Sequence, residues 1–264
     1  MSDAPTAAAY FGDRASYYDD RYDAPNPDGH ALRARMSAVL ELLGEGAGSV
    51  LDAGMGPGRL CGELAKRGWT VSGVDAADEM VTVARSRLPE AAPRLLRAEI
   101  EALPFENESF DAVTATGVLE YANVERAIAE LVRVLRPGGI AVVSYPNPHA
   151  LYGIWKSRVW YASIRGAKRA VRRPADFPRG SSLLSPVRFE RLLTSKDLSL
   201  TDVGHVSHLV VPTPFDLAAP KIAMRLGERL EGSNFLRRFT ATQIVYAARR
   251  TMPAGATTAS RRGS

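Results

Sequence analysis

The sequence contains very little cysteine and no long apolar run. Cys61 is the single cysteine in 264 residues, which excludes a disulfide framework and a metal cluster held by several cysteines. No stretch approaches the roughly 18 consecutive apolar residues that span a membrane, and residues 1–6 have neither a basic start nor an apolar signal core. These absences favour a cytoplasmic protein in a reducing compartment, and we expect no metal site.

Two common nucleotide-binding motifs are also missing. The glycines after residue 53 do not have the G-x-G-x-x-G spacing of dinucleotide folds. No lysine followed by serine or threonine completes a phosphate-binding loop there. A glycine-rich turn in this chain therefore requires a different ligand.

That turn lies in residues 50–60, which read Val-Leu-Asp-Ala-Gly-Met-Gly-Pro-Gly-Arg-Leu. The pattern predicts a strand that ends at Asp52, a tight turn through Gly54, Gly56 and Gly58, and a helix from residue 59. Asp52 would repel a pyrophosphate and attract an ammonium group, which favours a cofactor with an amino-acid moiety. The alternative is an ordinary strand-to-helix turn that is rich in glycine.

A second carboxylate follows the next predicted strand. Residues 69–74 form this predicted strand, which ends at Asp75, 17 residues after Gly58. A carboxylate at the tip of this strand can accept hydrogen bonds from both hydroxyls of a ribose bound over the glycine turn. The alternative is that Asp75 caps the helix predicted for residues 78–88.

Strand and helix patterns alternate from residue 50 onward, which indicates an α/β fold with a doubly wound parallel sheet. Ligands of such sheets bind at the carboxyl edge of the strands. The predicted strands are residues 50–52, 69–74, 95–98, 109–115, 140–145, 198–208 and 240–247. The residues expected at their carboxyl edge are Asp52, Asp75, Glu99, Thr116 and Tyr145.

Five ordered blocks, residues 50–59, 73–80, 99–105, 109–113 and 131–139, resemble the class I S-adenosylmethionine-dependent methyltransferases. The resemblance is to the small-molecule subgroup, which contains quinone and natural-product enzymes. It implies a Rossmann-like, mostly parallel sheet of seven strands with strand 7 antiparallel, and S-adenosylmethionine as the cofactor. Helical lid insertions would follow strand 5 and separate strands 6 and 7.

The resemblance also implies which residues bind the cofactor. Asp52 and the glycine turn would hold the methionine portion, Asp75 the ribose hydroxyls, and Met80 one adenine face. Two departures from the family are Glu99, where aspartate is more common, and Tyr121, where a histidine often stands. The implied cofactor-binding residues are Tyr18, Tyr22, Asp52, Gly54, Gly56, Gly58, Asp75, Ala76, Met80, Glu99, Ile100 and Thr116.

The implied domain organisation has three parts. Residues 1–43 form an N-terminal flap and helix, in which aromatic residues around Tyr18 and Tyr22 would close over the cofactor. Residues 44–250 form the methyltransferase domain, with insertions at about 147–184 and 210–238, and residues 251–264 a disordered tail. A monomer or a homodimer is expected.

The formal net charge of +5 is concentrated in one segment. Residues 156–191 carry ten basic and two acidic side chains, so the remainder of the chain is net acidic. Residues 151–173 therefore read as a basic amphipathic helix: a solvated lid, or alternatively a helix that rests weakly on anionic lipid. We expect no nucleic-acid binding, because the chain has no recognisable module for it.

The function favoured by the sequence is methyl transfer to a partly apolar small molecule of the natural-product type. The candidate catalytic residues near the expected acceptor are His149, Tyr121 and His208. The alternatives are a peripheral methyltransferase that acts on a quinone or lipid, and a protein that binds S-adenosylmethionine without catalysis.

Overall fold

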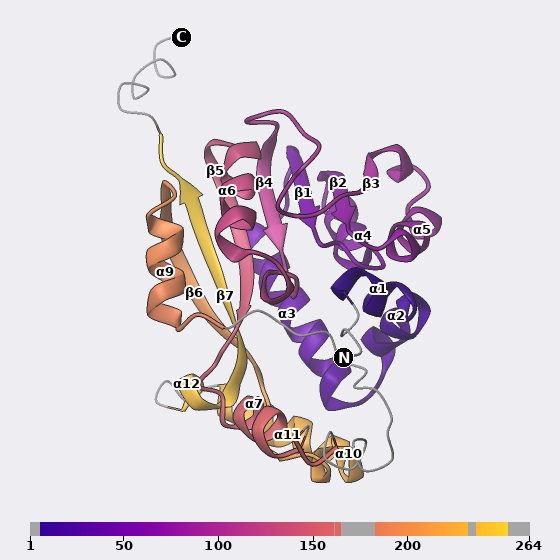
Figure 1. Ribbon diagram of the computed structural model, residues 1–264, viewed down its shortest axis with the longest axis vertical. Coiled ribbons are helices and arrows are strands. Elements are labelled where there is room, and N and C mark those ends of the chain that lie inside the picture. Colours follow the sequence, from indigo (N-terminus) through magenta and orange to yellow (C-terminus); the bar gives the residue numbers. More distant parts are fainter. Residues whose placement is uncertain (1–5, 161, 165–182, 232–235, 253–264) are drawn as a thin grey trace, which may run out of the picture.

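The computed structural model describes residues 6–160, 162–164, 183–231 and 236–252 (Figure 1). The strands are β1 (Ser49–Ala53), β2 (Thr70–Asp75), β3 (Leu95–Arg97), β4 (Phe110–Ala115), β5 (Leu135–Pro146), β6 (Leu198–His208) and β7 (Ala241–Arg250). The α-helices are α1 (Ala7–Gly12), α2 (Ala15–Asp23), α3 (Pro27–Leu43), α4 (Arg59–Lys66), α5 (Asp78–Arg87), α6 (Val124–Val134), α7 (Leu151–Trp155), α9 (Pro186–Thr194), α10 (Phe215–Ala218), α11 (Pro220–Glu231) and α12 (Arg237–Thr240). Single turns of other helix types are η1 (Ala92–Arg94), η2 (Leu119–Tyr121) and η3 (Lys156–Trp160).

The seven strands form one sheet in the order β3-β2-β1-β4-β5-β7-β6. The pairs from β3 to β5 are parallel, whereas β7 is antiparallel to both β5 and β6. The predicted doubly wound, mostly parallel sheet with an antiparallel strand 7 is confirmed. The order reverses direction at β1, between β2 and β4, and a crevice forms at such a point in open α/β sheets.

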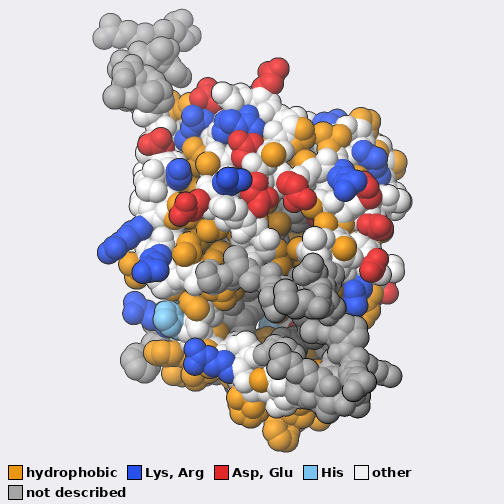
Figure 2. All heavy atoms as spheres, viewed as in Figure 1, with side chains coloured by type: hydrophobic (Ala, Val, Ile, Leu, Met, Phe, Trp, Pro, Cys, Tyr) orange, Lys and Arg blue, Asp and Glu red, His pale blue; other side chains and the backbone are white. Residues whose placement is uncertain are grey.

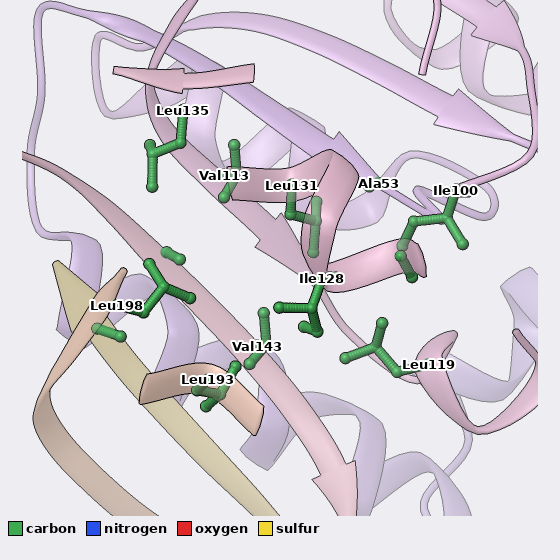
Figure 3. Packing of buried hydrophobic residues seen from close by; sticks show 14 of the residues in the cluster. Ala53, Ile100, Val113, Leu119, Ile128, Leu131, Leu135, Val143, Leu193 and Leu198 are labelled. Carbon is green, nitrogen blue, oxygen red and sulfur yellow. The ribbon is translucent and has the colours of Figure 1, made fainter. Parts of the chain in front are cut away.

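Helices cover both faces of the sheet because the strand residues are apolar on both sides. One face packs on α6 and α9 through Ile128, Leu131 and Leu193, which are at most 1% exposed (Figure 3). The other face packs on α3, α4 and α5 through residues such as Val39, Leu64 and Val81. Packing on both faces holds the carboxyl ends of the strands in fixed positions, and the site is built on these strand ends.

Three element boundaries differ from the sequence prediction. The sequence suggested a break at residues 25–29, but Asn26 caps α3 there by accepting a hydrogen bond from the N–H of Gly29, with Pro27 in the first turn. Within the second insertion, the apolar and basic pattern of residues 215–230 predicts one helix, but that helix is interrupted before Pro220, since a proline cannot continue the hydrogen bonding of a preceding turn.

Strand β5 is longer than expected. It begins at Leu135 and carries the Pro-Gly-Gly sequence inside it, where its pairing with β4 shifts register between Phe110 and Ala112. Gly138 has φ +78°, so the irregularity uses a conformation that glycine adopts readily.

The basic helix expected over residues 151–173 is described only in its first part. Helix α7 passes into the π-type turn η3, and residues 165–173 lie outside the described residues, as do residues 253–264 of the expected tail. In the described part of the chain, no helix has both the length and the apolar character needed to cross a bilayer.

Candidate functional site

The glycine turn after β1 has the conformation that its sequence requires. Gly54, Gly56 and Gly58 have φ values of +79°, +52° and +75°. A Cβ at Gly54 would lie 2.7 Å from the side chain of Val118, whereas one at Gly56 would meet nothing within 4 Å. The turn therefore passes close to the loop after β4 and leaves open space beside Gly56.

Asp52 is the buried carboxylate in front of this turn and is 1% exposed. Its Oδ1 accepts a hydrogen bond from the Thr114 hydroxyl at 2.8 Å, and its Oδ2 accepts from the Cys61 thiol at 3.5 Å. Burial raises the pKa of Asp52 to about 6, although both hydrogen bonds oppose the shift. A buried carboxylate next to a cavity is a strong attractor for a ligand ammonium group.

Asp75 ends β2 and joins two backbone segments. Its Oδ2 accepts from the N–H of Gly56 at 2.9 Å, and its Oδ1 accepts from the N–H of Ala77 at 3.0 Å. Burial raises the pKa of this carboxyl, and the two backbone donors oppose the increase. Ala77, rather than Asp75, occupies the cap position of α5, so the carboxylate stands beside the glycine turn with lone pairs available to a ligand.

These two carboxylates line a cavity of about 430 Å³ at the carboxyl edge of the sheet. Apolar contact surface between and beyond them comes from Met80 and Ile100, which are 2% and 4% exposed. The structure brings together all of the sequence-predicted cofactor residues except Gly58. The predicted residues that line the cavity are Tyr18, Tyr22, Asp52, Gly54, Gly56, Asp75, Ala76, Met80, Glu99, Ile100 and Thr116.

Gly58 has a packing role instead. It is the left-handed residue that starts α4, and a Cβ there would lie 3.0 Å from that of Ala84 on α5. Its lack of a side chain lets α4 begin directly against α5. The glycine is thus explained by helix contact, while its two neighbours in the turn face the cavity.

Helices α1 and α2 contribute lining residues to this cavity, and Figure 1 shows these helices beside α3 and α5. Phe11, Tyr18 and Tyr22 line it, and Phe11 packs edge-on against Tyr18 and Tyr121 with ring centroids 5.7 and 5.2 Å apart. The flap is held to the body by Asp19, which forms ion pairs of 2.6 Å with Arg59 on α4 and 2.5 Å with Arg87 on α5.

A second cavity of about 300 Å³ adjoins the first. The two share Phe11, Tyr18, Gly117 and Tyr121 as lining residues. The second is lined further by residues from α2, α3, η2, α7, η3 and the antiparallel strands: Arg21, Asp28, Ala31, Leu32, Arg35, Glu120, Tyr152, Gly153, Lys156, Leu209, Thr242 and Gln243.

Of the three predicted catalytic residues, the structure places Tyr121 between the two cavities. Burial raises the pKa of its phenol, so the hydroxyl stays protonated at neutral pH and can donate a hydrogen bond. His208 is 1% exposed and lines neither cavity; its Nδ1 lies 2.7 Å from the Thr240 hydroxyl and its Nε2 3.2 Å from the His205 carbonyl. His149 is exposed before α7 and lines neither cavity among the described residues.

The structure thus gives neither histidine access to the site. Residue 208 turns inward because Ser207, immediately before it, has φ +62°, which breaks the alternation of a regular strand. The backbone N–H of His149 donates to the Asn147 side chain in a local turn. Both residues are accounted for by packing and turn formation.

Sequence reasoning missed Arg35 and Glu120. Arg35 lies on α3 and is 9% exposed, which is unusual for an arginine, and Glu120 lies in η2 next to Tyr121. Burial raises the pKa of the Glu120 carboxyl, and Arg35 opposes that shift. The apolar spacing on α3 gave one signal, because Arg35 falls among its buried positions Leu32 and Val39.

No group of three or more histidine, cysteine, aspartate or glutamate side chains in the described ranges is arranged to hold a metal ion. The chemistry of the donor set in the first cavity instead suits a zwitterionic, ribose-bearing molecule. Asp52 has the charge to attract an ammonium group, Asp75 can accept hydrogen bonds from vicinal hydroxyls, and the apolar side chains of Met80 and Ile100 suit a flat ring.

Comparison with known proteins agrees with this geometry. A family model described as methyltransferase domain matches residues 51–143. The chain is 37% identical over 134 residues to a malonyl-[acyl-carrier protein] O-methyltransferase of Salmonella typhimurium, covering 50% of each protein. It is 41% identical over 138 residues to a demethylmenaquinone methyltransferase of Thermus thermophilus, covering 48% of this chain and 62% of the relative. The chain therefore spans half to about three fifths of the length of these relatives.

Solved structures show the same fold over more of the chain. A SAM-dependent methyltransferase from Thermotoga maritima has a TM-score of 0.63 at 18% identity, covering 92% of this chain and 99% of that one. A [4+2]-cyclase has a TM-score of 0.61 at 19% identity, covering 96% and 98%. Because this fold also occurs in a cyclase, fold alone does not define the chemistry, and the site residues must carry the functional argument.

Proposed function

We propose that this chain, which carries a class I S-adenosylmethionine-dependent methyltransferase domain, transfers the methyl group of S-adenosylmethionine to a small molecule in the second cavity. The observation that carries the proposal is the arrangement of two adjoining cavities with a shared wall. One contains the carboxylates Asp52 and Asp75, and the other is lined by aromatic, apolar and polar groups. A partly apolar acceptor of the natural-product type suits that lining.

The residues that would hold the cofactor are those of the first cavity. Asp52 attracts the ammonium group, Asp75 accepts from the ribose hydroxyls, and Met80 and Ile100 contact the adenine. When bound, S-adenosylmethionine supplies an electrophilic methyl group on a sulfonium. The remaining task of the chain is to align an acceptor atom with that methyl group and to exclude water, which can lower a barrier by about 7–11 kcal/mol at the ideal limit.

The residues that line both cavities would align the acceptor atom with the methyl group. Gly117 presents backbone without a side chain, while Phe11 and Tyr121 close the sides with aromatic surface. The Tyr121 hydroxyl is a hydrogen-bond donor that orients an acceptor. A hydroxyl acceptor would lose its proton to Glu120, because burial makes this carboxylate a stronger base than usual; a general base typically adds about 10²- to 10⁴-fold to the rate.

Isothermal titration of the full chain with S-adenosylmethionine and S-adenosylhomocysteine tests the cofactor assignment. Asp75→Ala is expected to weaken binding by about 100-fold, since charge-assisted hydrogen bonds contribute about 1.5–3 kcal/mol each. Asp78→Ala is the matched control: this carboxylate lies three residues further on and forms an exposed pair with Arg97. Absence of binding by the wild-type chain, or equal binding by Asp75→Ala, would overturn the assignment.

Transfer of isotope from methyl-labelled S-adenosylmethionine to a panel of small acceptors then tests catalysis. Label incorporation that depends on Glu120 supports the enzyme and its base. A chain that binds the cofactor tightly and methylates no member of a broad panel would favour the alternative of a binding protein without catalysis.

A second candidate, a peripheral enzyme of quinone or lipid methylation, is favoured by the surface of α10 and α11. Phe215, Ile222 and Leu226 are 64%, 61% and 40% exposed, and Figure 2 shows hydrophobic side chains gathered at this end of the molecule. Lys221, Arg225 and Arg229 lie on the same helix. Sedimentation with anionic vesicles that weakens as salt increases would support this candidate, whereas no sedimentation at low salt would exclude it.

A further inference from the structure

We infer that Arg35 binds a carboxylate group of the acceptor, so that the second cavity selects small hydroxy acids that carry a single negative charge. The inference rests on the proposed function, because it names the substrate class of the same site. It concerns a residue outside the domain that the family model matched, since that domain begins at residue 51.

The position of Arg35 is the first argument. A Cβ at Gly117 would lie 2.8 Å from its Nη1 and 3.0 Å from its Cζ, so the guanidinium lies directly against the backbone of Gly117. Gly117 lines both cavities. A group bound to this guanidinium would therefore be held at the junction between the cofactor and acceptor sides.

The second argument is that Arg35 forms no ion pair among the described residues. Among the described residues it contacts the Tyr18 hydroxyl and is influenced at longer range by Glu120, but no carboxylate forms an ion pair with it within 4 Å. A guanidinium has five N–H donors in a fork that matches a carboxylate. A buried arginine that lines a cavity and has no ion-pair partner among the described residues is expected to bind an anion there.

The other charged side chains around the cavity determine how many negative charges the bound anion can carry. Arg21 and Lys156 both pair with Asp28 at 3.4 Å. With Arg35 and Glu120 included, the described lining residues carry three cations and two carboxylates, which is one positive charge in excess. A carboxylate would neutralise it. A phosphate dianion would add a second negative charge next to Glu120 and Asp28, so the lining favours the carboxylate.

Gln243, at another part of the cavity wall, favours a ligand that carries a hydrogen-bond donor. Gln243 lines the same cavity from β7, and its buried Oε1 has no hydrogen-bond partner among the described residues. A buried carbonyl oxygen without a donor is rare in folded proteins. An acceptor molecule with a hydroxyl or N–H group would satisfy it, and together with the carboxylate this describes a hydroxy acid.

The test measures binding to the chain saturated with S-adenosylhomocysteine, so a failure to bind that compound would be recognised first as failure of the proposed function. The probes are 4-hydroxybenzoate, 4-hydroxyphenylacetate and 3-(4-hydroxyphenyl)propanoate, each compared with its own neutral amide. We expect at least one acid to bind about tenfold or more tightly than its amide, because the ion pair with a guanidinium is charge-assisted.

Arg35→Met is expected to abolish this preference for the acid, and Arg35→Lys to retain part of it. Arg126→Met, which removes an exposed guanidinium from α6, is the matched control and should preserve the preference. Binding of S-adenosylhomocysteine by each variant reports that it is folded. The inference is overturned if no acid in the panel binds better than its amide, or if the preference survives in Arg35→Met. Should Arg35→Met fail to fold, the acid-to-amide comparison in wild type and Arg35→Lys decides.

Discussion

The two cavities share a wall and are built in opposite ways. The first is formed largely by strand tips and the turns that follow them, within short segments around residues 52–57, 75–80, 97–101 and 116–118. The second is formed by side chains that reach inward from α2, α3, η2, α7 and β7, between residues 11 and 243. A site made of consecutive backbone turns is encoded locally, whereas a site made of converging side chains depends on how distant elements pack.

The largest expected effect comes from the backbone of the first cavity. Gly54→Ala places a Cβ at φ +79° and 2.7 Å from Val118, so the turn or the loop after β4 must move. A left-handed conformation costs about 1–2 kcal/mol for a residue with a side chain, before the clash is counted. We expect the affinity for S-adenosylhomocysteine, measured by isothermal titration, to fall by about 100-fold or more.

Gly204→Ala is the control for this substitution, because a Cβ in β6 would meet its nearest neighbour at 3.9 Å. It should bind the cofactor as wild type does. Normal cofactor binding by a folded Gly54→Ala would contradict the view that the first cavity depends on its backbone shape.

The next effect concerns the charge of Asp52. If this charge contributes to binding, the first cavity selects its ligand by electrostatics as well as by shape. With a pKa of about 6, this carboxyl is protonated as the pH falls through 6 and no longer attracts an ammonium group. Cofactor affinity should therefore decline by up to about tenfold per pH unit below that value. In Asp52→Asn the affinity should be lower at pH 8 and nearly independent of pH between 5 and 8; an unchanged pH profile would rule out this role.

The same carboxyl has the opposite effect on the unliganded fold. Its folded-state pKa is raised above the unfolded value of 3.8, so its stabilising contribution is complete below pH 3.8 and is lost as the pH rises through 6. The loss corresponds to about 3 kcal/mol at the stated shift. Chemical denaturation at pH 7.5 should find Asp52→Asn more stable than wild type; a less stable variant would contradict this account.

The smallest effect is expected from the flap that the cavities share. Arg59→Ala removes ion pairs of 2.6 and 2.5 Å to Asp19 and Asp23 on α2, and leaves Arg87 to hold Asp19. Pairs at a partly exposed surface contribute about 1 kcal/mol or less, so cofactor dissociation followed by stopped flow should accelerate by about fivefold or less. Lys66→Ala, on the same helix and paired only with Glu63 among the described side chains, should leave the rate unchanged. Equal dissociation rates in the two variants would show that the ion pairs of the flap do not limit cofactor release.

The sequence predicted the sheet and the first cavity because both rest on local signals. Apolar runs that end in Asp52 and Asp75, and glycines at alternate positions, have meaning within a few residues of each other. The boundary errors arose where local signals were ambiguous. Pro27 can either break a helix or start one, and here it starts α3; Pro220 divides α10 from α11 within a segment whose apolar pattern alone predicts one helix.

The second cavity could not be predicted because no short pattern connects its residues. Arg35 and Gln243 lie 208 positions apart in the chain and come to line one cavity only through the packing of α3 and β7. The chemistry of the histidines and their positions at or after strand ends favour a catalytic role, but Ser207 turns His208 inward and His149 remains at the surface. The residue type and its position in the sequence do not suffice to predict which side chains line the site, because one residue with positive φ can reverse the direction of the side chain that follows it.

Phe11 and Tyr18, which line both cavities, have a consequence for the order of events in a catalytic cycle. An acceptor that packs against these rings holds the flap in place over the first cavity, so a cofactor beneath it has no path in or out. We therefore expect a compulsory sequence: cofactor first, acceptor second, methylated product released next, and S-adenosylhomocysteine last. With this order of binding, S-adenosylhomocysteine inhibits competitively against S-adenosylmethionine. The residues shared by the two cavities would then determine the order in which ligands bind and leave.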